Sequence, residues 1–265
     1  MQSLLRLLRA PRTPSKTSAV QRDSIGFVLD DGRHVDVLRV RDPRARRIKL
    51  SVDERGARLS LPLRASLVSG ERFLHEHRDW LRLQLAAQGE HAGEGLQRGI
   101  TDALPLRGLD LPLHWTGGRA MRIDLDADAS LLFAAPATAG DAGLRRTLRD
   151  FYEAQGRADV GRWLPRYLGD LPRAPRRILF KRTSSQWGSL APDGTLSLDL
   201  ALVLARPSAF EYVLVHELCH LLHADHSRRF WREVEARFPA WRDERHYFHA
   251  EGRRLKARLR GLLAG

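Results

Sequence analysis

Apolar and polar residues alternate along the first part of the chain in the manner of β-strands. Residues 25–29 and 35–40 show this alternation, with Asp31-Gly32 between them. An Asp-Gly pair favours the tight turn that joins two antiparallel strands, so the pattern predicts a hairpin. Residues 48–52 and 59–61 alternate in the same way across a short polar turn, and they predict a second hairpin.

Further along, the apolar spacing lengthens to that of helices. Residues 66–88 are predicted to form a helix packed on the hairpins, and the Gly-rich polar residues 89–103 a loop. A long helix is predicted over residues 141–168, ended by Gly169 and Pro172. Further strands are predicted at residues 111–115, 121–125, 131–135, 177–181 and 195–200, with a Ser/Gly/Pro-rich loop between the last two.

The order of these elements, strands first and helices last, predicts an α+β fold. We divide the chain into a disordered basic extension at residues 1–22, a β-hairpin-rich region at residues 23–138 and a helical core with a short sheet at residues 139–265.

One predicted helix in the last region is apolar on nearly all sides. Ser208 follows Pro207 and precedes Glu211 by three residues, which is the spacing of a capping box. The helix that begins there is expected to be deeply buried. It nevertheless contains His216-Glu217-Leu218-Cys219-His220, an H-E-x-x-H motif whose polar groups need partners that a metal ion supplies.

The motif suits a catalytic zinc ion. On a helix, His216 and His220 lie about 40° apart around the axis and about 6 Å apart along it, so both imidazoles point to one place. Zinc binds histidine nitrogen, and a catalytic zinc ion has three protein ligands and a water molecule. Glu217 is placed to act as the general base on that water. Cys219 points away from the histidine pair, and we expect a buried, inert thiol.

Two histidines compete to be the third ligand. If the helix continued, His223 would lie about 10.5 Å along the axis from His216, too far to share an ion, and His226 would point away. If the helix ends near His223 and the chain turns at Ala224-Asp225, His226 can fold back. In the pattern H-E-x-x-H-x-x-G-x-x-H the third histidine follows the first by ten residues, which is also the separation of His216 and His226. We therefore favour His226 as the ligand and give His223 a supporting or packing role.

Composition limits the cellular setting. The 265 residues include one cysteine, which excludes a framework of disulfides and suits a reducing, cytoplasmic location. No apolar run is long enough to span a membrane, and we expect no secretory signal; in a eukaryote, the first 22 residues would also fit a transit peptide.

The net charge of +13 indicates affinity for polyanions, and the first 64 residues carry 15 Lys and Arg against 7 Asp and Glu. No nucleic-acid-binding motif accompanies this charge, and 41 of the 45 basic residues are arginine spread over every segment. Binding of nucleotides or nucleic acid through this Arg-rich surface stays the weaker interpretation.

Beyond the motif, the sequence resembles the YgjP-like metallopeptidases, which are related to the WLM and SprT-type proteins. The resemblance covers most of residues 25–250. It is carried by His216-Glu217-Leu218-Cys219-His220-Leu221 with His223, His226-Ser227 and Phe230-Trp231, by Ser185-Gln186-Trp187-Gly188-Ser189 with Leu196, Leu198 and Leu202-Val203-Leu204, and by the N-terminal run from Arg46-Arg47-Ile48 through Leu61-Pro62 to Trp80. Leu190 stands where the family commonly has cysteine, and Asp199 where it commonly has asparagine.

The resemblance implies a minimal zincin-like core at residues 139–265, Zn²⁺ on His216, His220 and His226, and Glu217 as the catalytic base. The expected activity is hydrolysis of peptide or protein substrates. The family also implies two alternatives, a UTP pyrophosphohydrolase and an SprT-like protease acting on DNA-associated proteins.

Several other residues near the motif are open to more than one role. Trp187 and Gly188 are interpreted as a packed indole and a tight turn. Arg182 is either solvated or a ligand for a substrate carboxylate or phosphate. His246 and Tyr247 are candidates for stabilising an oxyanion.

Overall fold

The structure is a computed structural model that describes residues 20–53, 56–92, 95–183 and 186–264. The chain forms two compact units that divide between Leu85 and Ala86. The extension predicted for residues 1–22 falls outside the described residues up to position 19, and the first strand begins at Gln21. The region boundaries predicted at residues 22 and 138 stay predictions.

The N-terminal unit contains a mixed four-stranded sheet in the order β1-β2-β4-β3. β1 and β2 pair antiparallel, which confirms the first hairpin, and Gly32 adopts a φ of 81° in its turn. β3 and β4 are neighbours, as the second hairpin predicts, and β4 also pairs in parallel with β2. The strands are β1 (Gln21–Val28), β2 (His34–Asp42), β3 (Lys49–Asp53) and β4 (Gly56–Pro62).

Two helices, α1 (Leu67–Glu76) and α2 (Arg78–Ala92), stand where one was predicted. The helix breaks at His77, whose ring nitrogen Nδ1 and backbone N–H both bond to the carbonyl oxygen of Phe73. Helix α2 also extends into residues 89–92, which were predicted to be a loop. Gly70 lets α1 approach β4, because a Cβ there would lie 3.0 Å from the Leu61 side chain.

In the C-terminal unit, a second sheet has the order β5-β6-β8-β7. Three of its strands were predicted, whereas the four-residue β5 was not. Its apolar side chains share one core with the helices of this unit. The strands are β5 (Ala103–Leu106), β6 (Leu109–Gly117), β7 (Arg122–Leu125) and β8 (Leu131–Ala135).

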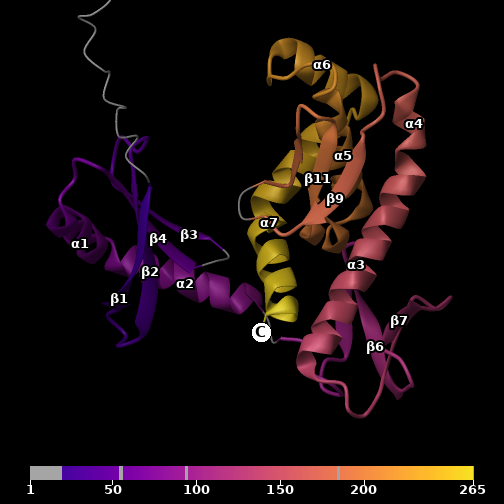
Figure 1. Ribbon diagram of the computed structural model, residues 1–265, viewed down its shortest axis with the longest axis horizontal. Coiled ribbons are helices and arrows are strands. Elements are labelled where there is room, and N and C mark those ends of the chain that lie inside the picture. Colours follow the sequence, from indigo (N-terminus) through magenta and orange to yellow (C-terminus); the bar gives the residue numbers. More distant parts are fainter. Residues whose placement is uncertain (1–19, 54–55, 93–94, 184–185, 265) are drawn as a thin grey trace, which may run out of the picture. The chain divides into compact units, whose positions relative to one another are not determined.

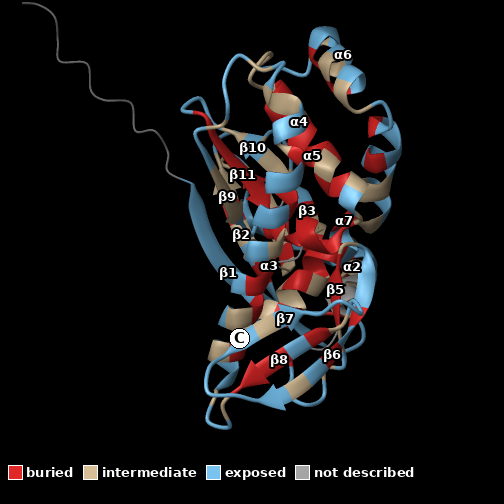
Figure 2. Cartoon of the chain, turned by 90° about the vertical axis from the view of Figure 1, so that its right-hand side faces the viewer, coloured by how far each residue is buried: buried red, intermediate tan, exposed pale blue. Residues whose placement is uncertain are grey.

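A third, three-stranded sheet with the order β10-β11-β9 lies close to the long helices of the same unit (Figure 1). Its central strand β11 is buried along its whole length (Figure 2). The three-residue β10 lies in the segment predicted to be a loop. The elements are α3 (Asp141–Trp163), α4 (Pro165–Leu168), β9 (Arg177–Lys181), β10 (Gly188–Leu190), β11 (Thr195–Asp199) and the 3₁₀ helix η1 (Leu200–Leu204).

Three helices complete the chain: α5 (Pro207–Cys219), α6 (Arg228–Arg237) and α7 (Trp241–Leu263). The capping box predicted for α5 is wrong. The N-cap is Arg206, and Pro207, whose missing N–H costs nothing in a first turn, begins the helix. Glu211 instead accepts hydrogen bonds from the Tyr167 hydroxyl and from Arg166.

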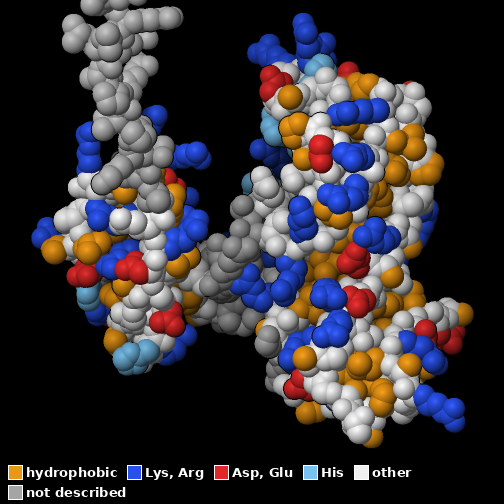
Figure 3. Space-filling model, viewed as in Figure 1, with side chains coloured by type: hydrophobic (Ala, Val, Ile, Leu, Met, Phe, Trp, Pro, Cys, Tyr) orange, Lys and Arg blue, Asp and Glu red, His pale blue; other side chains and the backbone are white. Residues whose placement is uncertain are grey.

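The described residues thus form a mixed α and β protein whose N-terminal unit is built on hairpins, while the zincin-like description of the core stays a prediction. Within the described ranges, no helix has both the length and the apolar character needed to cross a bilayer. On the face shown in Figure 3, Lys and Arg side chains are scattered, with acidic side chains among them.

Candidate metal centre

Helix α5 and its C-cap residue His220 carry the H-E-x-x-H motif in the core of the C-terminal unit. Most of its side chains are buried, as the apolar pattern predicted. The helix ends at Cys219, one turn earlier than expected, and the chain continues in tighter turns in which Leu222 and His223 both donate to the Cys219 carbonyl oxygen. Helix α6 then begins at the N-cap Ser227.

This turn brings three histidines together. The candidate ligand atoms of His216, His220 and His226 all lie within 4.8 Å of one another. The Nε2 atoms of His216 and His226 are 3.1 Å apart. Phe230 lies fully buried against all three imidazoles, with ring centroids 4.6–4.9 Å away. The first turn of α6 therefore supplies an apolar floor beneath the cluster.

Burial favours the neutral form of two of these histidines, His216 and His220. Burial lowers the pKa of His216 to about 3 and also lowers the pKa of His220. His220 Nδ1–H donates to the carbonyl oxygen of His223 at 3.0 Å, so its Nε2 carries the free lone pair. His223 thus meets the cluster through its backbone.

Glu217 lies beside this cluster and is only 6% exposed. Burial raises the pKa of Glu217 to about 7, while a hydrogen bond from the Leu190 backbone N–H acts in the opposite direction. Gly188 makes room for the side chain: a Cβ there would lie 2.6 Å from Glu217 Cγ. Gly188 is part of strand β10 rather than of a tight turn, and its missing side chain is what Glu217 requires.

A cavity of about 810 Å³ opens over these groups. The histidine cluster and Glu217 form part of its wall, together with the segment from Gln186 to Pro192. Arg173 and Arg245 also border the cavity, whereas Glu217 is the one acidic side chain among the described residues that line it. Tyr212, one turn before His216, also lines the cavity, and no sequence pattern pointed to it.

The remaining candidates lie elsewhere. Cys219 is fully buried, and burial raises the pKa of its thiol to about 12, so it is an unreactive packing residue. Arg182 lines a separate small cavity of about 180 Å³. His246 and Tyr247 are absent from the described residues that line the large cavity, and the Tyr247 ring packs under Arg206.

Comparison with protein families agrees with the motif. The family described as YgjP-like, metallopeptidase domain, matches residues 46–251. Among solved structures, the chain is similar to the metallopeptidase zymogen abylysin of Pyrococcus abyssi, with 25% sequence identity and a TM-score of 0.30. The match covers 38% of this chain and 96% of the abylysin chain. No curated protein matches the chain.

Proposed function

Since the chain belongs to the YgjP-like family of metallopeptidases, and is thus a metal-dependent hydrolase, we propose that it is a zinc peptidase whose ligands are His216, His220 and His226. The observation that carries this proposal is the meeting of three imidazoles beside a buried carboxylate in one cavity. The proposed core is a minimal zincin.

The residues fit a zinc ion. Two nitrogens at about 2.0–2.1 Å from a tetrahedral zinc ion are about 3.3 Å apart, close to the 3.1 Å between the Nε2 atoms of His216 and His226. Three imidazoles leave a fourth position open, as catalytic zinc sites do. When bound, zinc supplies a Lewis acid that polarises a carbonyl and makes water more acidic.

Glu217 performs the proton transfer in this proposal. Its carboxylate takes the proton of the attacking water and returns it to the leaving amine, so that the peptide bond is cleaved without a covalent enzyme intermediate. The N–H of Leu190 and the space at Gly188 fix one side of the carboxylate, which keeps it aimed at the cavity. Trp187 and Phe248, whose rings lie 4.4 Å apart, provide apolar surface for the substrate.

A second candidate substrate is a nucleoside triphosphate such as UTP. It is favoured by Arg173 and Arg245, which border a cavity with a single carboxylate among its described lining. One guanidinium group can donate two parallel hydrogen bonds to the oxygens of a phosphate group. A cavity bordered by two arginines therefore suits an anionic ligand.

Metal removal tests the proposed function. Dialysis against a chelator is expected to abolish cleavage of a mixed peptide library, and one equivalent of Zn²⁺ is expected to restore it, because the Lewis acid is lost and regained. Peptide products are identified by mass spectrometry, and pyrophosphate release from UTP is measured in parallel. Zinc-dependent release of pyrophosphate without peptide products would instead support the second candidate, and cleavage unaffected by the chelator would contradict both.

Gly188→Ala is expected to lower kcat about a hundredfold, because a misplacement of about 1 Å of a catalytic group has that effect. The new methyl group would displace Glu217, whose Cγ and Oε1 lie 2.6 and 2.7 Å from the Cβ position. Steady-state kinetics on a cleaved peptide measures the change. The control is Gly161→Ala in α3, where a Cβ meets nothing within 4 Å; equal kcat values for the two variants would contradict the assigned role.

A further inference from the structure

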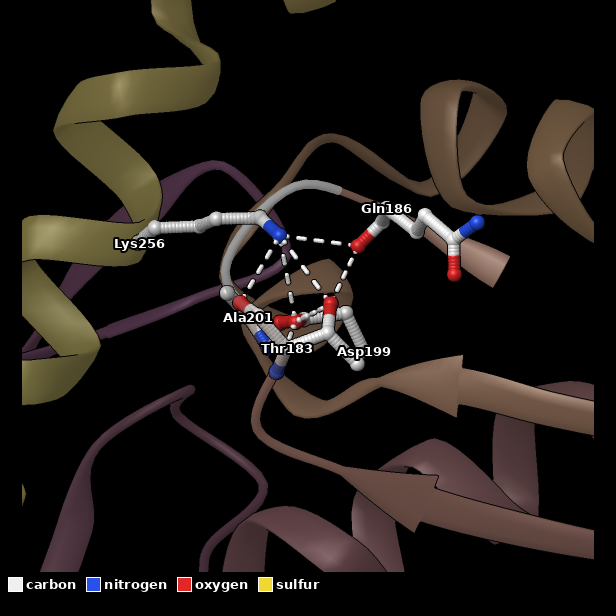
Figure 4. A network of polar contacts seen from close by, with 5 residues as sticks. All are labelled: Thr183, Gln186, Asp199, Ala201 and Lys256. Carbon is white, nitrogen blue, oxygen red and sulfur yellow. Dashed lines mark hydrogen bonds and ion pairs between the residues drawn. The ribbon is translucent and has the colours of Figure 1, made fainter. Parts of the chain in front are cut away.

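Helix α7 carries a buried lysine that takes no part in the chemistry proposed above. Lys256 is 9% exposed. Its Nζ donates to the carbonyl oxygens of Gln186 at 2.8 Å and Thr183 at 3.0 Å, and lies 3.3 Å from the Asp199 carboxylate (Figure 4). A buried ammonium group needs such partners for its protons. The lysine therefore ties α7 to the backbone immediately before strand β10.

Asp199 completes the connection from the other side. Asp199 is 1% exposed, and its carboxylate accepts hydrogen bonds from the backbone N–H groups of Thr183 at 2.7 Å and Ala201 at 2.8 Å. Its own N–H donates to the carbonyl oxygen of Trp187 at 2.8 Å. The Lys256–Asp199 pair thus fixes Thr183 and Gln186 to the end of β11 through hydrogen bonds to their backbone groups and to the Thr183 hydroxyl.

Trp187, which lines the large cavity, contacts Lys256 and its neighbours on α7. Its ring packs against Phe248, lies 4.6 Å from Lys256 Nζ, and touches the backbone at Gly252, where a Cβ would lie 3.0 Å from the ring. Phe248, Gly252 and Lys256 are four residues apart and share one face of α7. The next residue after Trp187 is Gly188, against which Glu217 lies.

We propose that Lys256 is a positioning residue for Glu217: through Asp199, Thr183 and Gln186 it holds Trp187 and strand β10, which in turn hold the carboxylate. This inference rests on the proposed role of Glu217. A buried ion pair can also serve stability alone, and the two roles predict different behaviour of variants in which the charge is removed.

The primary test compares Lys256→Met with Arg254→Met, an exposed control on the same helix that pairs with Glu251. We expect Lys256→Met to keep its zinc content, to lose about 10- to 100-fold in kcat and to change less in KM, because Glu217 is misplaced while the histidines are not. The control is expected to match the wild type in all three quantities. A kcat within twofold of the wild type in Lys256→Met would overturn the proposal.

A double variant guards against simple failure to fold. Lys256→Met leaves Asp199 buried and unpaired, whereas Asp199→Asn combined with Lys256→Met removes both charges. We expect the double variant to unfold at a temperature near that of the wild type but to keep the low kcat, because the Thr183 and Gln186 carbonyl oxygens still lack the Lys256 ammonium group that joins them to α7. Recovery of kcat to within twofold in the double variant would assign the pair to stability alone and overturn the proposal.

Hydrogen exchange provides a readout that does not depend on activity. Amide exchange over residues 186–200, measured by mass spectrometry, is expected to become faster in both Lys256 variants and to stay unchanged in Arg254→Met and in α6. Unchanged exchange in this segment would overturn the proposal. If the proposed function itself is wrong, Glu217→Gln and the wild type will cleave peptides equally, and that outcome is distinct from a change in exchange at β10.

Discussion

Glu217→Gln is expected to lower kcat about 10²- to 10⁴-fold, the range that a positioned general base contributes. The amide cannot accept the proton of water, so the step assigned to the carboxylate is lost. Zinc content is expected to stay at one equivalent, because the proposed ligands are the three histidines and not Glu217. Steady-state kinetics with metal analysis of the same preparation measures both quantities.

The fold is expected to tolerate this substitution. Gln has nearly the shape of Glu, its carbonyl oxygen can still accept the Leu190 N–H, and removing a carboxylate that is only 6% exposed removes a desolvation cost. The unfolding temperature of the metal-free variant should therefore equal or exceed that of the wild type. Glu211→Gln is the matched control, since Glu211 lies on the same helix but bonds to Tyr167 and Arg166. Turnover in Glu217→Gln comparable to that of this control would contradict the mechanism.

The histidine pair and its helix were accessible to sequence reasoning because their geometry is local. Residues four apart on a helix must share a face, whatever surrounds them. The start of the same helix was predicted with the wrong cap, because Ser208 and Glu211 have the right spacing but Tyr167, far away in sequence, takes the Glu211 carboxylate. A local signal thus failed where a distant residue competed for the same group.

The part of the cavity wall formed by residues 186–192 was harder to predict than helix α5. Strand β10 has three residues in a Ser/Gly/Pro-rich segment, too few to show an alternating pattern. Its role depends on Gly188 leaving room for Glu217, and on Lys256 reaching Asp199 across 57 positions of sequence. Neither contact has a periodic signature. Leu190 acts through its backbone N–H, which leaves no trace in the pattern of side chains.

Asp199 is a buried carboxylate, and the structure gives it a cationic partner. Lys256 Nζ lies 3.3 Å from Asp199 Oδ2, and both side chains are buried. A buried carboxylate without a cationic partner would strongly destabilise the folded state. Removing the charge of Lys256 alone is therefore expected to cost more stability than removing the charges of Lys256 and Asp199 together.

The second prediction with a large expected effect tests whether His226 or His223 is the third zinc ligand. His226→Ala is expected to weaken zinc binding about a hundredfold and to abolish zinc-dependent turnover at zinc concentrations that saturate the wild type. Structural zinc sites with four ligands bind with about 10–16 kcal/mol, so one ligand contributes about 3 kcal/mol, which corresponds to this factor. Competition with a chromogenic chelator measures the affinity.

His223→Ala is the matched control for this experiment, because it removes an imidazole three residues away. The contact of His223 with the cluster is its carbonyl oxygen, which accepts the His220 Nδ1–H and is kept in the alanine variant. Its zinc affinity is therefore expected to stay within about tenfold of the wild type, the smaller end of the effect seen when groups that orient a ligand are altered. The opposite ranking, with His223→Ala the weaker binder, would place the third ligand on His223 and would require the turn at Ala224-Asp225 to rearrange when the metal binds.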